Sequence, residues 1–167
     1  MNLCKKFRAT AMAVVLLISA ISVAATAEIG SSSGERPPAI QKAAFARWLV
    51  RRSSWGVLST LNSTGGDPFG NVMSYSDGNG TGVPYFYLTV KLDPTGAFAV
   101  NNPRASLTVA EYALGSCGSG ADPQSPLCSK ITLSGKMELL LDDSPEAAKA
   151  KEYLFKDHPK LSGNFYN

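Results

Sequence analysis

Few residues in this 167-residue chain could carry chemistry: three cysteines and a single histidine. Cys117 and Cys128 flank a proline-punctuated stretch, and His158 is followed directly by a proline. The sequence contains neither H-E-x-x-H nor G-x-S-x-G, so a mechanism that needs a histidine base would depend on His158 alone. We interpret His158 as a solvated residue at a helix end. The chain is therefore predicted to be non-enzymatic, with no catalytic and no metal-binding residues.

The N-terminal segment decides how the cysteines are interpreted. Lys5, Lys6 and Arg8 precede an uncharged run from Ala9 to Ala25, and Ala25-Thr26-Ala27 has the small-x-small form of a signal-peptidase site. A transmembrane anchor is the alternative, but the run is at the short end for a bilayer span. Residues 1–27 are predicted to be a signal peptide, with the mature chain starting at Glu28. This predicts a secreted protein that is not inserted in a membrane after the leader is removed.

Removal of the signal peptide removes Cys4 and leaves only Cys117 and Cys128. In an oxidising compartment we expect these two residues to form a disulfide. The bond closes a ring of about twelve residues, for which the chain-entropy relation gives a stabilisation of about 3 kcal/mol. A zinc site is the weaker alternative, because two thiolates and a distant His158 do not complete a tetrahedral ligand set. The loop is interpreted as a clasp on the strand that follows it.

Two N-x-[ST] sequons lie in predicted loops, at Asn62-Ser63-Thr64 and Asn79-Gly80-Thr81. We expect N-glycosylation at Asn62 and Asn79 if the chain enters the secretory pathway. The alternative is that both asparagines act only as turn residues.

The charge balance excludes another class of function. Sixteen basic residues less the three in the leader leave thirteen, which balance the thirteen acidic residues. The mature chain has no basic run longer than Arg51-Arg52. It therefore lacks the positive surface that nucleic acid or anionic lipid requires, and nucleic-acid binding is not expected.

The mature chain is long enough for one domain. Residues 28–37 indicate a flexible leader, and "PPAIQKAAFARWLVRR" predicts an amphipathic helix from Pro37 whose buried face holds Ile40, Ala44, Trp48 and Leu49. Period-two patterns predict strands, and a helix with Ser144 as N-cap and Pro145 at its first position is expected to follow them. The predicted strands are 55–61, 69–76, 83–90, 104–112 and 130–140, with a helical or turn segment at 93–102 and the helix at 145–156. This order predicts an α+β fold built on a small barrel.

The glycines Gly78, Gly80 and Gly82 do not indicate a nucleotide site. The loop joins two predicted strands, so it lacks the helix N-terminus that binds a phosphate.

Four segments, in their order and spacing, resemble the CREG family, the secreted cellular repressors of adenoviral-early-gene-stimulated transcription. They are "SDGNGTGVPYFYLT", "NNPRASLTVAE", "DPQSPLCSKITLSGKM" and "LFKDHP". The resemblance implies a split β-barrel of the flavin-binding, pyridoxamine-phosphate-oxidase type, which forms a homodimer through barrel faces. It also implies a secreted or endolysosomal glycoprotein linked to growth control and differentiation. Some members are recognised by the mannose-6-phosphate/insulin-like growth factor II receptor, so a cell-surface or lysosomal sorting receptor is an expected partner.

The same resemblance raises the question of a flavin. Flavin-binding relatives hold the FMN phosphate with cations on barrel strands, whereas the strand that looks equivalent here, residues 70–76, offers only Asn71 and Ser76. Lys91 and Arg104 lie nearby in sequence. We expect no cofactor, and an FMN-dependent oxidoreductase remains the alternative.

The chain also stops at Asn167, after "SGNFYN", whereas CREG-like proteins continue through a segment that completes the barrel. Residues 38–167 are therefore expected to form a split β-barrel domain that lacks its final strand. A short isoform, an incomplete gene model and a dimer that covers the open edge are the three interpretations.

Overall fold

The fold was analysed in a computed structural model of the whole chain, which describes residues 2–9 and 34–162. The predicted cleavage site after Ala27 lies outside the described residues. So does the first part of the flexible leader predicted at residues 28–37. The end of that leader is anchored, since Arg36 donates hydrogen bonds to Glu111.

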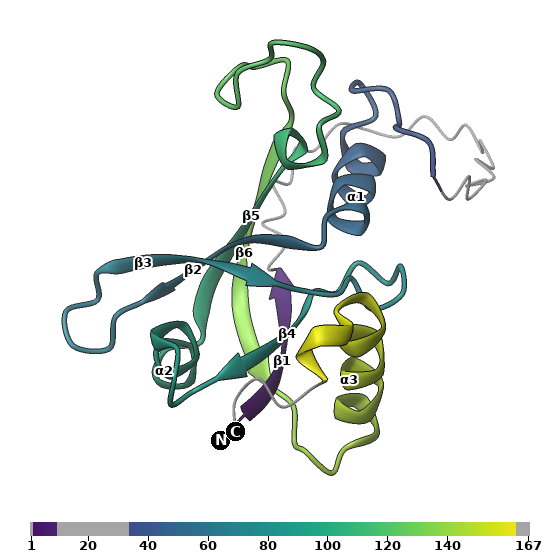
Figure 1. The fold of residues 1–167 in the computed structure, drawn as a ribbon. Helices are drawn as coiled ribbons and strands as arrows, with labels where there is room; N and C mark the ends of the chain where they lie inside the picture. Colours follow the sequence, from purple (N-terminus) through teal and green to yellow (C-terminus); the bar gives the residue numbers. More distant parts are fainter. Residues whose placement is uncertain (1, 10–33, 163–167) are drawn as a thin grey trace, which may run out of the picture.

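A six-stranded sheet in the order β3-β2-β5-β6-β1-β4 forms the body of the molecule (Figure 1). Every strand pair in it is antiparallel. In residues 2–9 and 34–162, three α-helices and two short 3-10 helices connect or follow the strands. The elements are β1 Asn2–Ala9, α1 Lys42–Arg52, β2 Trp55–Leu61, β3 Pro68–Ser74, β4 Tyr85–Thr89, α2 Pro94–Asn101, β5 Arg104–Ala110, η1 Glu111–Leu114, β6 Lys130–Leu139, α3 Pro145–Asp157 and η2 Pro159–Leu161.

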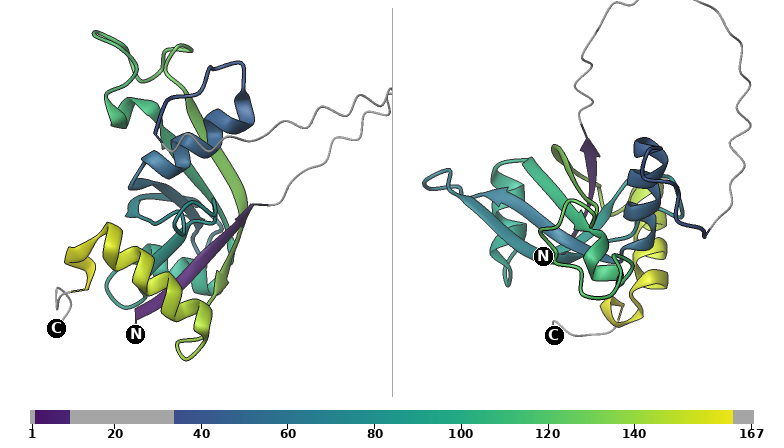
Figure 2. Two further views of the ribbon diagram at one scale, coloured as in Figure 1. Left: turned by 90° about the vertical axis from the view of Figure 1, so that its right-hand side faces the viewer. Right: turned by 90° about the horizontal axis from the view of Figure 1, so that it is seen from above.

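The sheet closes into a barrel where the end of β3 meets the start of β4. Ser76 and Tyr85 form an isolated antiparallel bridge, with the Ser76 N–H bonded to the Tyr85 carbonyl at 3.1 Å and the reverse bond at 2.8 Å. The two further views in Figure 2 show the sheet curling around its interior, with α3 lying alongside β1. The predicted α+β class and small barrel are confirmed.

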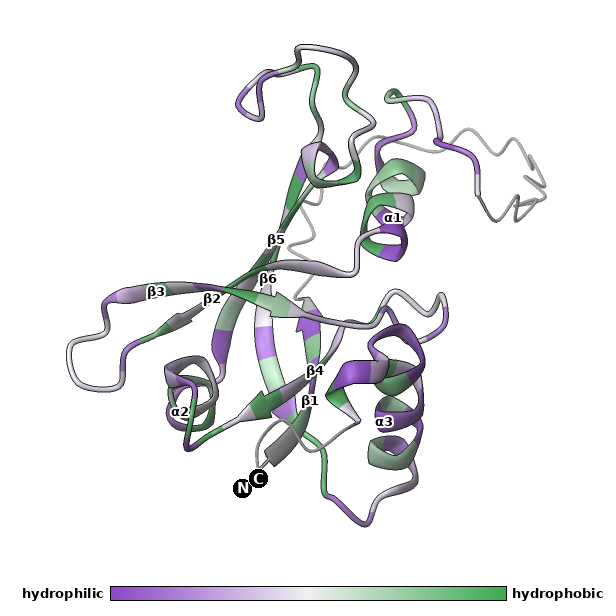
Figure 3. Ribbon diagram, in the orientation of Figure 1, coloured by the Kyte–Doolittle hydropathy of each residue, from purple (hydrophilic) through white to green (hydrophobic). Residues whose placement is uncertain are grey.

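Two hydrophobic clusters hold the barrel together. The larger fills its interior and includes Phe7, Leu58, Phe86 and Leu107, which are all 2% exposed or less. The smaller lies between the sheet and α3. Hydrophilic and hydrophobic bands alternate along β6 (Figure 3), as expected of a strand with one face toward a core. The clusters explain why the period-two segments of the sequence form strands.

The first helix differs from its prediction. It begins at Lys42 and not at Pro37, because residues 38–41 form a turn in which the Gln41 N–H bonds to the Pro38 carbonyl. Ile40 lies outside the helix and is 88% exposed, so the predicted buried face was wrong at this residue. Phe45, Leu49 and Val50 make the buried face instead. Ala44 is exposed, and Trp48 packs against the barrel core from a half-buried position.

The other predicted elements are confirmed within a few residues, including the β2–β3 hairpin and the Ser144-Pro145 start of α3. The Ser144 hydroxyl accepts the Ala147 N–H at 3.1 Å, as an N-cap should. One strand was not predicted. Residues 2–9, which the sequence assigned to a cleaved leader, form β1 and pair with both β4 and β6.

Candidate functional site

The segment between β5 and β6 extends beyond the end of the barrel (Figure 1). We call residues 115–129 the disulfide loop. Cys117 and Cys128 are bonded to each other, with their Cα atoms 5.1 Å apart. Cys128 is buried, whereas Leu127 beside it is 83% exposed. The Lys130 ammonium donates to the carbonyls of Pro123 and Gln124, so the strand after the loop also fixes the loop's fold.

A buried carboxylate fastens both ends of the disulfide loop. Glu111 is 0% exposed and accepts hydrogen bonds from the guanidinium of Arg36, the Ser116 hydroxyl at 3.1 Å and the Ser129 N–H at 3.3 Å. Burial alone would raise the pKa of Glu111, but these hydrogen bonds outweigh it and hold the pKa below its ordinary value. Arg36 also lies over the Phe45 ring at 4.9 Å, which links the loop to α1.

Sequence analysis did not single out Glu111, although a signal was present. Leu107, Val109 and Glu111 follow one another at period two, and all three are buried. An acidic residue that continues the inward face of a strand needs internal partners, because an unpaired buried carboxylate is very costly.

The two sequon asparagines lie in different environments. Asn79 is exposed in the loop 77–82, where it adopts a left-handed backbone with φ 59°. Asn62 is half-buried, and its side-chain oxygen accepts the Thr64 N–H at 3.0 Å in the turn between β2 and β3. Both asparagines serve turns, which is compatible with either of the interpretations made from the sequence.

A polar cleft of about 330 Å³ lies between the end of α1, the loop 77–82 and α3. It holds both signs of charge, and no ion pair among the described residues uses its three cations. Tyr75 is not available as a base there, because burial raises its pKa and its hydroxyl donates to the Val50 carbonyl at 2.6 Å. The charged lining residues are Arg51, Arg52, Lys156, Asp77 and Asp157. Within the described residues, no group of three His, Cys, Asp or Glu could hold a metal.

His158 lies at the end of α3, as predicted, but it is not fully solvated. It is half-buried, and its Nε2 is 2.9 Å from the Tyr75 carbonyl. The prediction of a solvated side chain was therefore wrong, because α3 packs its last turn against the end of β3.

The residues that the sequence offered to a flavin have other partners. Asn71 donates to the Asp93 carboxylate and to Thr95 at the start of α2. The Ser76 hydroxyl donates to Asp157 at 2.6 Å. Lys91 is an exposed residue after β4. Neither Asn71 nor Ser76 is free to hold a phosphate in this arrangement.

Arg104 has a different setting, in a row of cations across the outer face of the sheet. Its register partner on β6 is Lys136, whose register partner on β1 is Arg8. All three are exposed, and within the described residues only Arg8 has an ion pair, with Glu138 at 3.0 Å. Like charges directly opposite one another destabilise a sheet, and an anion bound between Arg104 and Lys136 would relieve this repulsion.

Two further rows on this outer face carry small or β-branched side chains. Val72, Val57, Thr108 and Thr132 are successive register partners across β3, β2, β5 and β6, and Gly70, Ser59, Ser106 and Ser134 form the next row. All eight are half-buried or exposed. We call these eight residues the outer barrel face. Its side chains are uncharged and either small or β-branched, and these properties suit close packing against another sheet.

The fold and the disulfide loop define a class, a split β-barrel with an added disulfide-bonded loop. The family described as "CREG, beta-barrel" matches residues 37–163, and the chain belongs to that family. Mouse protein CREG2 is 40% identical over 141 residues, which are 80% of this chain and 48% of that protein. Human protein CREG1 is 41% identical over 132 residues, 75% of this chain and 59% of the relative.

Chicken protein CREG1 is 37% identical over 156 residues, and the match covers 88% of this chain and 79% of the relative. The chain thus spans about half the length of the CREG2 proteins it matches and more of the CREG1 proteins. A solved heme binding protein from Mycobacterium smegmatis superposes with a TM-score of 0.58 at 24% identity, covering 80% of this chain and 48% of that one. That likeness is one of fold, and it confirms the predicted split barrel.

Proposed function

We propose that this chain is a secreted, non-enzymatic glycoprotein that acts through its protein surfaces, with the disulfide loop as its recognition site. The observation that carries the proposal is the way this loop is held. A disulfide and the buried Glu111 carboxylate fix the loop outside the barrel, and Leu127 is presented on it. A disulfide of this kind belongs to an oxidising compartment. Loops fixed on a rigid scaffold commonly carry recognition.

The CREG family membership supports this function, because its members at 36–41% identity are named as proteins without an enzymatic activity in the name. The partner we propose is a cell-surface or lysosomal sorting receptor, in a role in growth control, differentiation or the endolysosomal system. N-glycans at Asn62 and Asn79 would then be part of the mature surface. None of the helices in the described ranges is long and apolar enough to cross a membrane.

The test is the product released by a eukaryotic cell that expresses the full chain. We expect a colourless protein in the medium that starts at Glu28, carries glycans and is two hydrogens lighter than its reduced form. Mass spectrometry before and after deglycosylation and reduction measures the N-terminus, the glycans and the disulfide. An absorbance spectrum measures the colour. Retention of the chain in the cell would contradict secretion, and a flavin absorbance band would contradict the non-enzymatic function.

The partner within the assembly is proposed to be a second copy of the chain. The outer barrel face lacks charged side chains in both rows and includes Val72, which is 61% exposed. Sedimentation of the protein should show a dimer, and Thr108→Arg should convert it to a monomer by placing a cation in the middle of the face. Ala148→Arg, on the exposed side of α3, is the matched control and should stay dimeric. A monomeric wild type contradicts the dimer.

An FMN-dependent oxidoreductase is the second candidate, and the exposed Arg104–Lys136 pair, which remains after cleavage at Ala27, favours it. Two neighbouring cations could hold the phosphate of a flavin by charge-assisted hydrogen bonds. The engagement of Asn71 and Ser76 by other residues argues against it. Titration with FMN distinguishes the two functions, because a binding protein at micromolar concentration quenches flavin fluorescence, whereas a flat signal up to millimolar protein excludes the oxidoreductase.

A further inference from the structure

The first strand occupies an inner position of the sheet, between β4 and β6. Its residues 2–6 pair with residues 85–89 of β4, and residues 5–9 pair with residues 135–139 of β6. The Phe7 N–H continues the first ladder to the Pro84 carbonyl, and the Cys4 carbonyl accepts the Leu140 N–H at 3.1 Å. We call the space between β4 and β6 the strand slot. Without β1, both of its edges would present unpaired backbone groups.

The strand slot has a separate recess for each side of the inserted strand. Cys4 is 0% exposed and packs with Leu140, Ala147, Ala150 and Leu154 beneath α3. Phe7 points to the opposite face and joins the core of the barrel. This alternation is how a sheet edge selects a peptide, because every second side chain enters the same recess.

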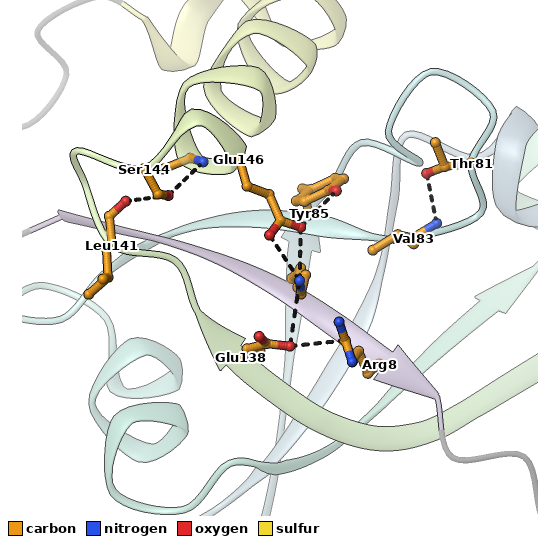
Figure 4. Close-up of polar contacts among 10 residues, drawn as sticks. Arg8, Thr81, Val83, Tyr85, Glu138, Leu141, Ser144 and Glu146 are labelled. Carbon is orange, nitrogen blue, oxygen red and sulfur yellow. Dashed lines mark hydrogen bonds and ion pairs between the residues drawn. The ribbon is translucent and has the colours of Figure 1, made fainter.

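Acidic groups line the α3 side of the strand slot (Figure 4). The Lys6 ammonium is 2.8 Å and 3.0 Å from the two oxygens of Glu146 and 3.6 Å from Glu138. Tyr85 donates to Glu146 at 3.4 Å, and Arg8 pairs with Glu138 at 3.0 Å. The carboxylates come from α3 and β6, so they belong to the slot and would remain if β1 left it. They select a cation at the position of Lys6.

The burial of Lys5, the other lysine of β1, opposes retention of this strand in the slot. Lys5 is 3% exposed, and its ammonium has one hydrogen-bond partner among the described residues, the Ala99 carbonyl at 2.7 Å. Burial lowers the pKa of Lys5, as expected where no carboxylate compensates for lost water. If β1 left the slot, the Lys5 ammonium would be hydrated again. The hydration free energy gained would offset part of the free energy lost with the backbone and core contacts of β1.

We propose that the strand slot is a peptide-binding site, which β1 occupies in the full chain and which an extended basic-apolar segment of a partner protein enters by strand addition after β1 is removed. The proposal rests on the leader cleavage in the proposed function, since cleavage after Ala27 removes β1. The partner segment carries lysine or arginine at the position of Lys6, a small apolar residue two positions before it and a bulky apolar residue directly after it. Glu138 and Glu146 supply the complementary charge.

The experiment uses the full chain with a specific protease sequence inserted between Ser32 and Ser33, outside the described residues. The chain is cut in solution and mixed with a fluorescent peptide of residues 2–9, and anisotropy measures uptake. We expect the cut chain to take up one peptide per molecule. The uncut chain should take up far less, because its own β1 competes at a high effective concentration, an advantage of about a hundredfold or more.

Variants of the peptide test the recognition. Lys6→Glu places a carboxylate against Glu138 and Glu146 and should weaken uptake at least about tenfold. Lys6→Arg should bind nearly as well as the original peptide. Glu146→Gln in the protein should weaken uptake of the original peptide but not further weaken that of the Lys6→Glu peptide. Absence of uptake by the cut chain, or equal uptake of the Lys6→Glu peptide, would overturn the proposal.

If the cut chain does not stay soluble, hydrogen exchange of the uncut chain decides. The proposal requires β1 to open before the rest of the barrel, so amides in the β1–β4 and β1–β6 ladders should exchange faster than those between β2 and β5. Equal protection would overturn it. Peptide uptake without secretion would contradict the proposed function alone, and secretion without uptake would contradict the strand slot alone.

Discussion

The guanidinium of Arg36 donates to the carboxylate of Glu111 across 75 residues of sequence, with Nε 2.5 Å from Oε1. Glu111 is fully buried, whereas the Arg36 side chain is 42% exposed. A buried charge is stable only when it is paired and hydrogen-bonded, so this contact holds together the segment before α1, the end of β5 and the disulfide loop.

Glu111→Gln should lower the free energy of unfolding by about 2 kcal/mol, the usual effect of losing hydrogen bonds to a charged group. A glutamine side chain has only one acceptor oxygen, so it cannot accept all the hydrogen bonds that the two carboxylate oxygens accept from Arg36, Ser116 and Ser129. Chemical denaturation measures the change, and Glu152→Gln on the exposed side of α3 is the control. Equal stability of the two variants would show that Glu111 is not a structural anchor.

The same residue predicts an acid dependence. The folded-state pKa of Glu111 lies below the ordinary value, so its contribution is complete above the pKa of the unfolded chain and is lost as the pH falls through the folded pKa. The loss of stability between neutral and acidic pH should therefore be smaller in Glu111→Gln than in the wild type. Unfolding curves at several pH values measure this, and parallel pH profiles would count against it.

The disulfide is expected to stabilise the loop and, through it, the barrel. Cys117→Ala with Cys128→Ala should lower stability by about 3 kcal/mol, according to the loop-entropy relation. Amides of residues 113–130 should exchange faster, while those of the β2–β3 hairpin keep their protection. An unchanged melting curve for the double variant would contradict the role of the loop as a clasp.

Glu146 should give the full chain a second acid dependence, which requires β1. The hydrogen bond from Lys6 is the main cause that lowers the pKa of Glu146. This stability is present above the unfolded-state pKa and lost as the pH falls through the folded pKa. Lys6→Met keeps most of the side-chain length and should reduce the dependence, since Tyr85 and Arg8 also lower the pKa of Glu146. The same acid profile in Lys6→Met and wild type would show that Lys6 does not set the charge of Glu146.

Glycosylation is tested at each sequon separately. Asn62→Gln and Asn79→Gln should each remove the mass of one glycan from secreted protein, and the double variant should not respond to a deglycosylating enzyme. Asn101→Gln, outside any sequon, is the matched control. An unchanged mass in either sequon variant means that this asparagine serves only its turn.

The sequence predicted those elements whose signals are local. The Ser144-Pro145 start of α3 and the β2–β3 hairpin depend on caps, turn residues and alternation, and they lie where expected. The start of α1 was wrong because a turn at residues 38–41, in which the Gln41 N–H bonds to the Pro38 carbonyl, takes the place of the predicted first helical turn. β1 could not be predicted, because Lys5 and Lys6 are typical of a leader and become buried only through Ala99 and Glu146.

The candidate site was predicted in part. The pairing of the cysteines could be predicted from their number and the expected compartment alone. The anchoring of the disulfide loop by Glu111 could not, because its hydrogen-bond partners come from three separate segments. The outer barrel face was also not visible in the sequence. Val72, Val57, Thr108 and Thr132 become neighbours only through strand register.

The barrel seam between β3 and β4 rests on a single bridge, Ser76 with Tyr85, whereas the other strands share full ladders. The end of α3 reinforces this seam from outside, through Asp157 on the Ser76 hydroxyl and His158 on the Tyr75 carbonyl. The last turn of the helix therefore works as a latch. A disturbance that lifts α3 would unzip the barrel at this seam first and flatten it into an open sheet, with the inner ladders still intact.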